Sequence, residues 1–238
     1  MADLNDRCPS GINGLDELME GGFPRGRTIL VSGSCGTGKS TFGIQFLYNG
    51  IVMHNEPGIL VTMEQTAEDL KKDMLKLGFD IEGEEKSGNL IILDRKRVIP
   101  EVDGLSDIVT DSMAKIKPKR MVIDSLGAIN FLMGEGEKIR SELLTLSERI
   151  KNAGITTVLV SERQEGEEAI SAHGIESYIL DGVVILTIHP ALDTRKMEIR
   201  KMRGTKHTLR MLDFDFTENG IEIVGGSGPK EGHKKVII

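Results

Sequence analysis

The sequence predicts an α/β fold, in which helices flank a central, mostly parallel sheet that antiparallel strands extend at the C-terminal end. Three observations predict this. Short apolar runs recur along the first two thirds of the chain, and segments with helical periodicity separate them. From about residue 180, strand-like runs follow one another with only short connections. Alternating strands and helices are typical of a parallel sheet with helices on both faces, whereas short connections favour antiparallel neighbours.

The parallel part contains five runs with the β-branched, apolar composition of strands buried on both faces. They are Arg27–Gly33, Gly58–Met63, Asn89–Asp94, Arg120–Asp124 and Thr156–Ser161. Between them, apolar residues at helical spacing predict helices. One is capped by Thr66 and stopped by Gly78, and another begins at Ser106. A third ends at Gly154.

The C-terminal part is predicted to continue the same sheet without helices. Its strands are Gly182–Ile188, Lys196–Met202, Leu209–Phe216 and Ile221–Val224. We therefore expect a single domain over residues 1–224. The Gly-rich, polar segment 225–238 is predicted to be a flexible tail.

Composition excludes several classes of protein. The 238 residues carry a net charge of -7, so bulk charge would not hold the chain on nucleic acid. Two cysteines are too few for a disulfide framework or a zinc ribbon. No apolar run is long enough to span a membrane, and the acidic N-terminus lacks the apolar core of a signal peptide. The expected location is the cytoplasm.

Residues 33–40 read GSCGTGKS and match the phosphate-binding pattern G-x-x-x-x-G-K-[ST]. The motif directly follows a predicted strand and precedes a helical segment, which is the context that it requires. Lys39 is expected to reach the terminal phosphates of a nucleotide and Ser40 to offer its hydroxyl to Mg²⁺. The expected nucleotide contacts are Gly33, Ser34, Cys35, Gly36, Thr37, Gly38, Lys39, Ser40 and Thr41. Cys35 is expected to have no chemical role of its own.

Acidic residues at strand ends supply the remaining chemistry that hydrolysis of a nucleotide needs. Asp124 ends one predicted strand and is expected to hold Mg²⁺, through water. Glu64 ends another strand and is the candidate general base for the attacking water. Gln65 could orient that water without accepting a proton. Ser161 and Glu162 are candidates to sense the terminal phosphate, or are simply the end of a strand.

Residues 195–210 form a cationic strip with seven Lys or Arg against one Glu. Period-two alternation predicts that Met197 and Ile199 share a strand face with Lys201 and Arg203, so that an apolar face turns cationic at its end. Cations on a packed face need anionic partners. A nucleotide phosphate, nucleic acid and acidic neighbours are the three candidates.

Taken together, these segments resemble the KaiC-like, RecA-fold ATPases, and in particular the first of the two ATPase domains repeated in KaiC. The resemblance runs from about Pro9 to Val224. It rests on SGINGLDELMEGGFPRGRTILVSG, the loop GSCGTGKS followed by TFGIQFLYNG, VTMEQ, RMVIDS, TTVLVSER, and IRKMRGTKH followed by FDFTENGIEI. It implies a RecA-like fold, Mg²⁺-dependent ATP binding and hydrolysis, and rings, commonly hexamers, with ATP at the subunit interfaces.

The resemblance also implies roles for individual residues. Lys201 and Arg203 match positions that contact the phosphates of the neighbouring subunit's nucleotide. Met202, Thr205 and His207 match positions that line the same nucleotide. Glu64 matches the catalytic glutamate. Thr217 and Glu218 match base-side or ribose-side positions only loosely.

The chain departs from the KaiC pattern in two places. Gln65 stands where KaiC has a second adjacent glutamate, which puts the rate of hydrolysis in question. The position of the KaiC phosphoacceptor pair reads Glu176, Ser177, Tyr178, so Ser177 is the one acceptor present and an autokinase is only weakly supported.

Two classes of function remain. The first is a slow, ring-forming ATPase that acts as a switch on a protein partner. The second is a recombinase paralogue that binds DNA during repair. The segment 162–176 has five Glu against one Arg and the segment 127–140 is neutral, so acidic loops disfavour DNA. Basic groups at 95–97 and at 115–120, which include Arg120, leave an outer contact with DNA open.

Overall fold

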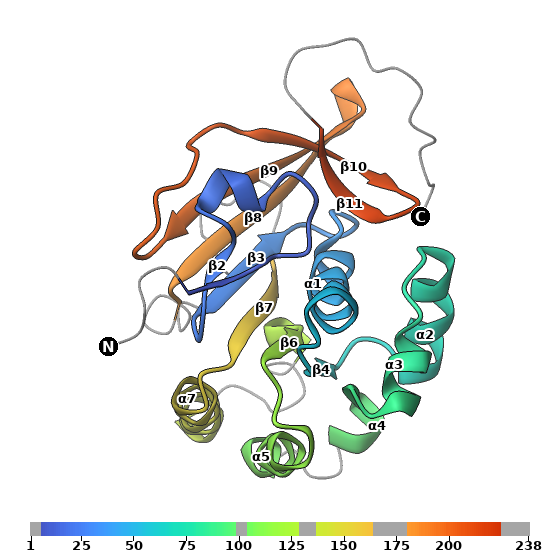
Figure 1. The fold of residues 1–238 in the computed structure, drawn as a ribbon, viewed down its shortest axis with the longest axis vertical. Helices are drawn as coiled ribbons and strands as arrows, with labels where there is room; N and C mark the ends of the chain where they lie inside the picture. The colour runs from blue at the N-terminus through green and yellow to red at the C-terminus, as the bar shows by residue number, and fades with distance from the viewer. Residues whose placement is uncertain (1–5, 99–103, 129–136, 164–179, 225–238) are drawn as a thin grey trace.

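The computed structural model describes residues 6–98, 104–128, 137–163 and 180–224, and its centre is a nine-stranded sheet (Figure 1). The strand order is β11-β10-β9-β8-β3-β7-β6-β4-β5. The six strands from β8 to β5 pair in parallel, and β9, β10 and β11 add to them in antiparallel fashion. The predicted α/β class, with its mostly parallel sheet and antiparallel C-terminal extension, is confirmed.

The strands lie close to their predicted positions. They are β3 (Thr28–Gly33), β4 (Gly58–Thr62), β5 (Leu90–Asp94), β6 (Arg120–Asp124), β7 (Thr156–Glu162), β8 (Gly182–His189), β9 (Thr194–Met202), β10 (Leu212–Thr217) and β11 (Gly220–Val224). One detail of the expectation is wrong: β8, the first strand of the predicted antiparallel group, pairs in parallel with β3. The tail expected over residues 225–238 lies outside the described residues.

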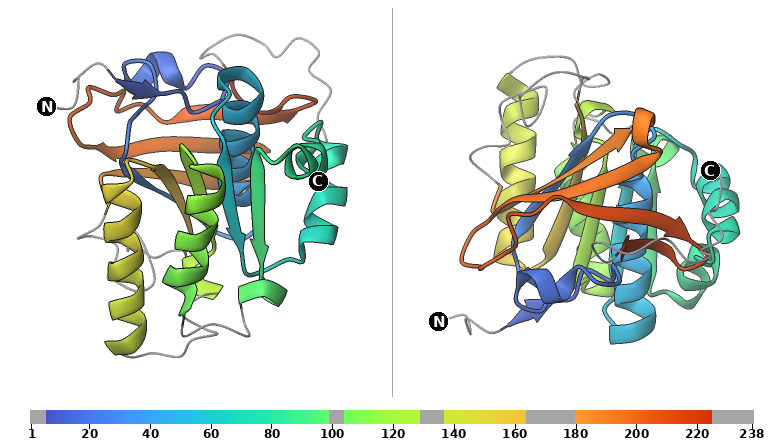
Figure 2. Two further views of the ribbon diagram at one scale, coloured as in Figure 1. Left: turned by 60° about the horizontal axis from the view of Figure 1, so that its bottom comes forward. Right: turned by 90° about the horizontal axis from the view of Figure 1, so that it is seen from above.

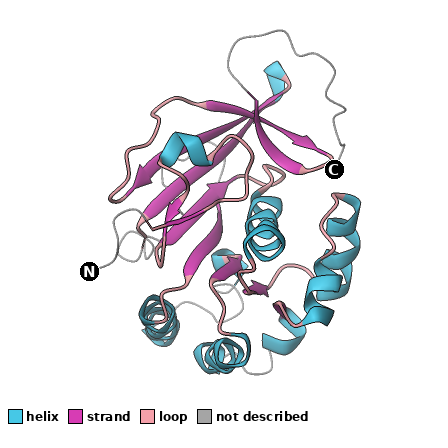
Figure 3. Ribbon diagram, in the orientation of Figure 1, coloured by secondary structure: helices cyan, strands magenta, loops and turns pink. Residues whose placement is uncertain are grey.

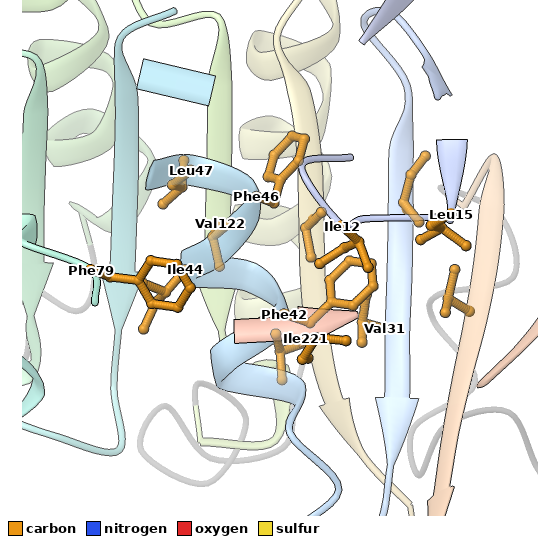
Figure 4. Packing of buried hydrophobic residues seen from close by; sticks show 14 of the residues in the cluster. Ile12, Leu15, Val31, Phe42, Ile44, Phe46, Leu47, Phe79, Val122 and Ile221 are labelled. Atoms are coloured by element: carbon orange, nitrogen blue, oxygen red, sulfur yellow. The ribbon is translucent and has the colours of Figure 1, made fainter. Parts of the chain in front are cut away.

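One face of the sheet is covered by α1 (Lys39–His54), α2 (Ala67–Lys76) and α3 (Ile81–Ser87). Phe42 and Phe46 of α1 pack with Val31 of β3 and Val122 of β6 in one large apolar cluster (Figure 4). Thr66 caps α2 by accepting a hydrogen bond from the backbone N–H of Asp69, as the sequence predicts. Helix α3 is not among the helices predicted from the sequence.

The opposite face is covered by α5 (Leu105–Ile116) and α7 (Glu137–Asn152), which lie side by side (Figures 1 and 2). Val109 of α5 and Leu146 of α7 pack on Leu30 of β3 and Ile59 of β4. Leu30 faces this cluster whereas its neighbour Val31 faces α1, which is the alternation of a strand buried on both sides. Figure 3 shows the helices in cyan around the magenta strands of the sheet. The short helix α4 (Arg95–Val98) follows β5.

The N-terminal segment packs against the loop that follows β9. It contains β1 (Arg7–Cys8), the 3-10 turn η1 (Asp16–Met19) and β2 (Phe23–Pro24). Glu20 accepts hydrogen bonds from the Arg7 side chain at 2.7 Å and from the backbone N–H of Lys206 at 3.2 Å. Arg7 also donates to the Thr205 hydroxyl at 2.6 Å. The N-terminal segment therefore holds the loop after β9 through two residues, Arg7 and Glu20.

Arg120 is a packing residue and not a surface cation. Its side chain is fully buried, donates to Glu56 at 2.6 Å and to the carbonyl of Phe46 at 2.8 Å, and lies over the Phe46 ring. A Cβ at Gly50 would overlap the Arg120 guanidinium, so this position of α1 requires glycine. The expectation that Arg120 belongs to an outer basic surface is wrong, because the apolar strand β6 turns its first side chain inward.

Within the described ranges, none of the helices combines the length and the hydropathy needed to cross a lipid bilayer.

Candidate functional site

The loop Gly33–Ser40 joins the end of β3 to the start of α1 and has the backbone geometry of a phosphate cradle. Gly36 and Gly38 have positive φ values of +75° and +98°, which favour glycine. A Cβ at Gly33 would lie 2.6 Å from the carbonyl oxygen of Leu186. The glycines of the motif therefore allow a tight turn beside β8, and they leave the backbone open to a ligand.

The polar groups of this loop are turned toward its centre. The Lys39 ammonium donates to the carbonyl of Ser34 at 2.8 Å, and the Thr37 hydroxyl donates to the same oxygen at 2.9 Å. Helix α1 starts at Lys39, and its N-cap residue, Gly38, provides no side-chain cap. Its first N–H groups, with the positive end of the helix dipole, are available to an anion.

Asp124, at the end of β6, lies beside the first turn of α1. Its carboxylate accepts a hydrogen bond from the Ser40 hydroxyl. Its Oδ1 atom is buried and has no hydrogen-bond partner in the described part of the chain. Burial raises the pKa of Asp124 to about 6, and the negative charges of Glu64 and Glu162 add to the rise, whereas Ser40 and Lys39 oppose it. An orphaned carboxylate oxygen next to a hydroxyl fits the oxygen-ligand chemistry of Mg²⁺.

The described residues hold no cluster of three or more His, Cys, Asp or Glu side chains that could bind a metal unaided. Ser40 and Asp124 would therefore hold Mg²⁺ together with phosphate oxygens and water, which is how this ion is usually bound in nucleotide sites.

Glu64 follows β4, which pairs with β6 in parallel, so that its strand end meets that of Asp124. The Ser125 hydroxyl donates to Glu64 Oε1 at 2.6 Å and itself accepts from the backbone N–H of Ala128. Ser125 is buried, whereas Glu64 and Gln65 are exposed in the cleft. A carboxylate held in this way, on the open side of the phosphate loop, is placed to accept a proton from water.

A cleft of about 580 Å³ extends from the phosphate loop to side chains of β9, β10 and α2 that were not predicted from the sequence. Arg195 and Phe216 line it from β9 and β10, with the Arg195 guanidinium 4.9 Å from the ring centroid. Met74 and Leu77 line it from α2 and the residue following α2. The sequence offers one signal only: Arg195 is the first cation of the strip. The cleft offers a cationic, aromatic and apolar lining to the remainder of a nucleotide.

The cationic strip does not follow the predicted alternation, because β9 contains a β-bulge. Ile199 pairs with Val184 and Lys201 with Val183, so Arg200 is the extra residue of the bulge, with no residue opposite it in the backbone register of β8. The bulge shifts the phase, and Met202 instead of Lys201 continues the apolar face of Met197 and Ile199. The prediction that Lys201 and Arg203 share that face is wrong. The side chain of Met202 is buried in the core, so only its backbone is left for the predicted nucleotide contact.

Lys201 and Arg203 lie far from the phosphate loop of their own subunit. Met202 pairs with Gly182, and Gly182 pairs with Ile29 at the start of β3, four residues before Gly33. At about 3.3 Å per residue this places Arg203, which follows the last residue of β9, more than about 13 Å along the strand direction from the loop, and β9 is the second strand from β3. The predicted residues thus form two groups, one at each end of the sheet.

The other residues predicted to line the neighbouring subunit's nucleotide, Thr205 and His207, lie with Arg203 in the loop after β9. Thr205 is half-buried against Arg7, and the His207 ring contacts the carbonyl of Thr208 at 2.9 Å. Thr217 and Glu218 are at the opposite end of β10 from this loop. Cys35 is exposed in the phosphate loop and is not bonded to Cys8, whose buried thiol has a pKa raised by burial to about 11.

Several predicted features fall wholly or partly outside the described residues. They are Ser177, most of the acidic segment 162–176 and part of the segment 127–140. Of the strand end at Ser161 and Glu162, Ser161 is buried and Glu162 is exposed and lines the cleft.

Comparison with known proteins matches residues 8–227 to the family model of the KaiC ATPase. The chain belongs to the KaiC ATPase family. It is 38% identical over 240 residues to the circadian clock oscillator protein KaiC of Parathermosynechococcus lividus, a match that covers 93% of this chain and 44% of the relative. It is 37% identical to KaiC of Synechococcus elongatus, with 89% and 43% covered. The chain thus spans less than half the length of these relatives.

Among solved structures, a KaiC-like protein from Pyrococcus horikoshii OT3 superposes with a TM-score of 0.84 at 39% sequence identity. The match covers 92% of this chain and 99% of that protein. The RecA-like fold inferred from the sequence motifs is therefore confirmed, and with it a nucleotide-binding fold of the KaiC type.

Proposed function

We propose that this chain binds ATP with Mg²⁺ in the cleft beside Gly33–Ser40 and hydrolyses it slowly within a ring of identical subunits. The resemblance to KaiC favours a hexamer. One observation carries the proposal. The phosphate loop, Glu64 and Asp124 gather at one end of the sheet, whereas Lys201 and Arg203 lie at the other end, away from the phosphates that this loop would bind. The cations complete a site only when a second copy supplies them.

The residues of one subunit have separate tasks in the proposed reaction. The loop N–H groups and Lys39 would hold the phosphates, and Ser40 and Asp124 would hold Mg²⁺, which would neutralise charge at the phosphate oxygens. Glu64 accepts a proton from the attacking water, and Ser125 holds the Glu64 carboxylate toward the cleft.

The neighbouring subunit supplies positive charge. Lys201 and Arg203 would stabilise the charge that develops on the terminal phosphate oxygens, as a cation supplied across an interface can. Thr205 and His207 belong to the same loop and would line the nucleotide from that side, with the backbone of Met202. The rate of ATP hydrolysis would therefore depend on contact between subunits.

We further propose that the ring acts as a switch on a protein partner. Net charge of -7 disfavours a DNA substrate. The burial of Arg120 removes one cation from the outer surface on which the DNA-repair alternative depends.

Two variants test the shared site. Glu64→Gln should retain ATP binding and lose turnover, and Arg203→Ala should also lose turnover while its own cleft stays intact. Mixed together, each supplies what the other lacks, because an Arg203→Ala subunit still has Glu64 and can receive Arg203 from a Glu64→Gln neighbour. Phosphate release should recover in the mixture.

Mass in solution, measured by light scattering without nucleotide, with ATP and Mg²⁺, and with ADP, is the parallel measurement. A ring of about six subunits that forms with ATP supports the proposal. A mixture that stays inactive, or a monomer under all conditions, would refute the shared site, and salt-dependent DNA binding would then be the next assay.

A further inference from the structure

Two adjacent residues just before β8, Leu180 and Asp181, contact Lys201 and Arg203. The Lys201 ammonium donates to the carbonyl of Leu180 at 3.1 Å. The backbone N–H of Arg203 donates to the carbonyl of Asp181 at 2.9 Å, and the Arg203 guanidinium lies 3.7 Å from Asp181 Oδ1. Both long side chains are therefore directed by one short segment of their own subunit.

Asp181 is itself rigidly held. It is buried, and its backbone N–H donates to the carbonyl of Thr28 at 2.9 Å. Its Oδ2 accepts from the backbone N–H of Thr28 at 3.4 Å, and its Oδ1 accepts from Arg27 at 3.0 Å. The carboxylate is thus a fixed point at the N-terminal end of β3, in the centre of the sheet.

The two arginines that share this carboxylate differ in how tightly they are held. Arg27 makes a direct hydrogen bond at 3.0 Å, whereas Arg203 at 3.7 Å is attracted without one. The Arg203 side chain is 54% exposed. Because Arg27 neutralises part of the charge of Asp181, the attraction on Arg203 is weak, and the exposed Arg203 guanidinium is accessible to a second molecule.

We propose that Asp181 is a positioning residue for Arg203: its carboxylate orients the guanidinium outward before a neighbouring subunit's nucleotide meets it. The inference rests on the proposed function. A side chain oriented in advance loses less conformational freedom when it engages the phosphate, so the benefit falls on turnover. ATP binding in the subunit's own cleft does not involve Asp181.

Asp181→Asn is the first test, because asparagine keeps the size of the side chain and one oxygen that can accept from Thr28 or Arg27, while it removes the charge. ATP turnover should fall by about two- to fivefold, the size expected for a half-exposed ion pair. ATP affinity and ring mass should not change. Asp181→Glu, which restores the charge, should regain part of the turnover. Asp107→Asn is the matched control, because it breaks the 2.7 Å ion pair with Arg149 between α5 and α7, and it should leave turnover unchanged.

Two readouts separate positioning from a merely structural role. In an Arg203→Ala background, Asp181→Asn should not lower the residual turnover further in a single-turnover assay, since its target is gone. Mixed with Glu64→Gln subunits, Asp181→Asn subunits should regain activity, because their own clefts then receive a well-oriented Arg203. Additive effects of the two substitutions, no recovery in the mixture, or increased turnover of Asp181→Asn would overturn the inference.

The two proposals fail in different ways. Wild-type turnover of Arg203→Ala would remove the shared site and, with it, the target of Asp181. Impaired Arg203→Ala together with unaltered Asp181→Asn would leave the shared site in place and refute only the positioning role.

Discussion

Asp124 should destabilise the nucleotide-free protein, and replacing it with asparagine should therefore stabilise the fold while damaging the site. The carboxylate is buried, and its Oδ1 has no partner among the residues that the structure describes. Asparagine is nearly the same size, and its carbonyl oxygen can still accept the hydrogen bond from Ser40. The substitution removes the buried charge and puts an amide NH2 group where the unpartnered oxygen stood, a change that does not depend on pH.

The magnitude follows from the pKa of Asp124, which rises from the ordinary 3.8 to about 6, mainly through burial. This rise corresponds to a cost of about 3 kcal/mol for the ionised form in the folded protein. Between pH 4 and 6 the folded state binds more protons at this residue than the unfolded state. The contribution of Asp124 to stability therefore decreases as the pH rises through this window, and it stays low above pH 6.

Urea unfolding of the wild type and of Asp124→Asn, measured without nucleotide from pH 4.5 to 8, checks this. The difference in free energy of unfolding, which cancels the other titrations, should shift by about 2 kcal/mol in favour of the variant between pH 4.5 and 8 and level off above pH 7. With ATP and Mg²⁺ at about 100 times the dissociation constant, the wild type should gain about 2.7 kcal/mol and the variant much less. A pH-independent difference, or a variant less stable than the wild type at pH 8 without ligand, would refute the reasoning.

Three further outcomes are expected. Glu64→Gln should bind ATP as the wild type does and lower phosphate release by about 100-fold or more, the usual contribution of a general base; a smaller loss would assign the proton to another acceptor. Glu56→Ala should lower the free energy of unfolding by about 3–5 kcal/mol, because it leaves Arg120 buried and unpaired, and urea denaturation measures it. Arg195→Ala should weaken ATP binding by about five- to tenfold in calorimetry, because it removes the cation that lines the cleft over the Phe216 ring. Lys196→Ala, which breaks only the ion pair with Asp213, is the control and should leave the affinity unchanged.

The sequence predicts most of the fold because the signals involved are local. The apolar strands fall within a few residues of their predicted bounds, since burial on both faces demands a nearly uninterrupted apolar composition. The phosphate loop is equally local, because loop, glycines, lysine and serine are contiguous. Even the approach of Glu64 to Asp124 was predictable, since both end strands of a parallel sheet, whose carboxyl ends meet at one edge.

What the sequence by itself determined is the family, the sheet, the phosphate loop and the residues at its strand ends. Only the tertiary structure decided the direction of the cationic strip. The bulge at Arg200 reverses the alternation that the sequence predicts, because the backbone accommodates an extra residue where the core needs Met202. Partners distant in sequence, such as Asp181 with Arg27 and Arg203, likewise become neighbours only when β8 pairs with β3 and β9. Contacts of this kind depend on strand register, which no local pattern of residues specifies.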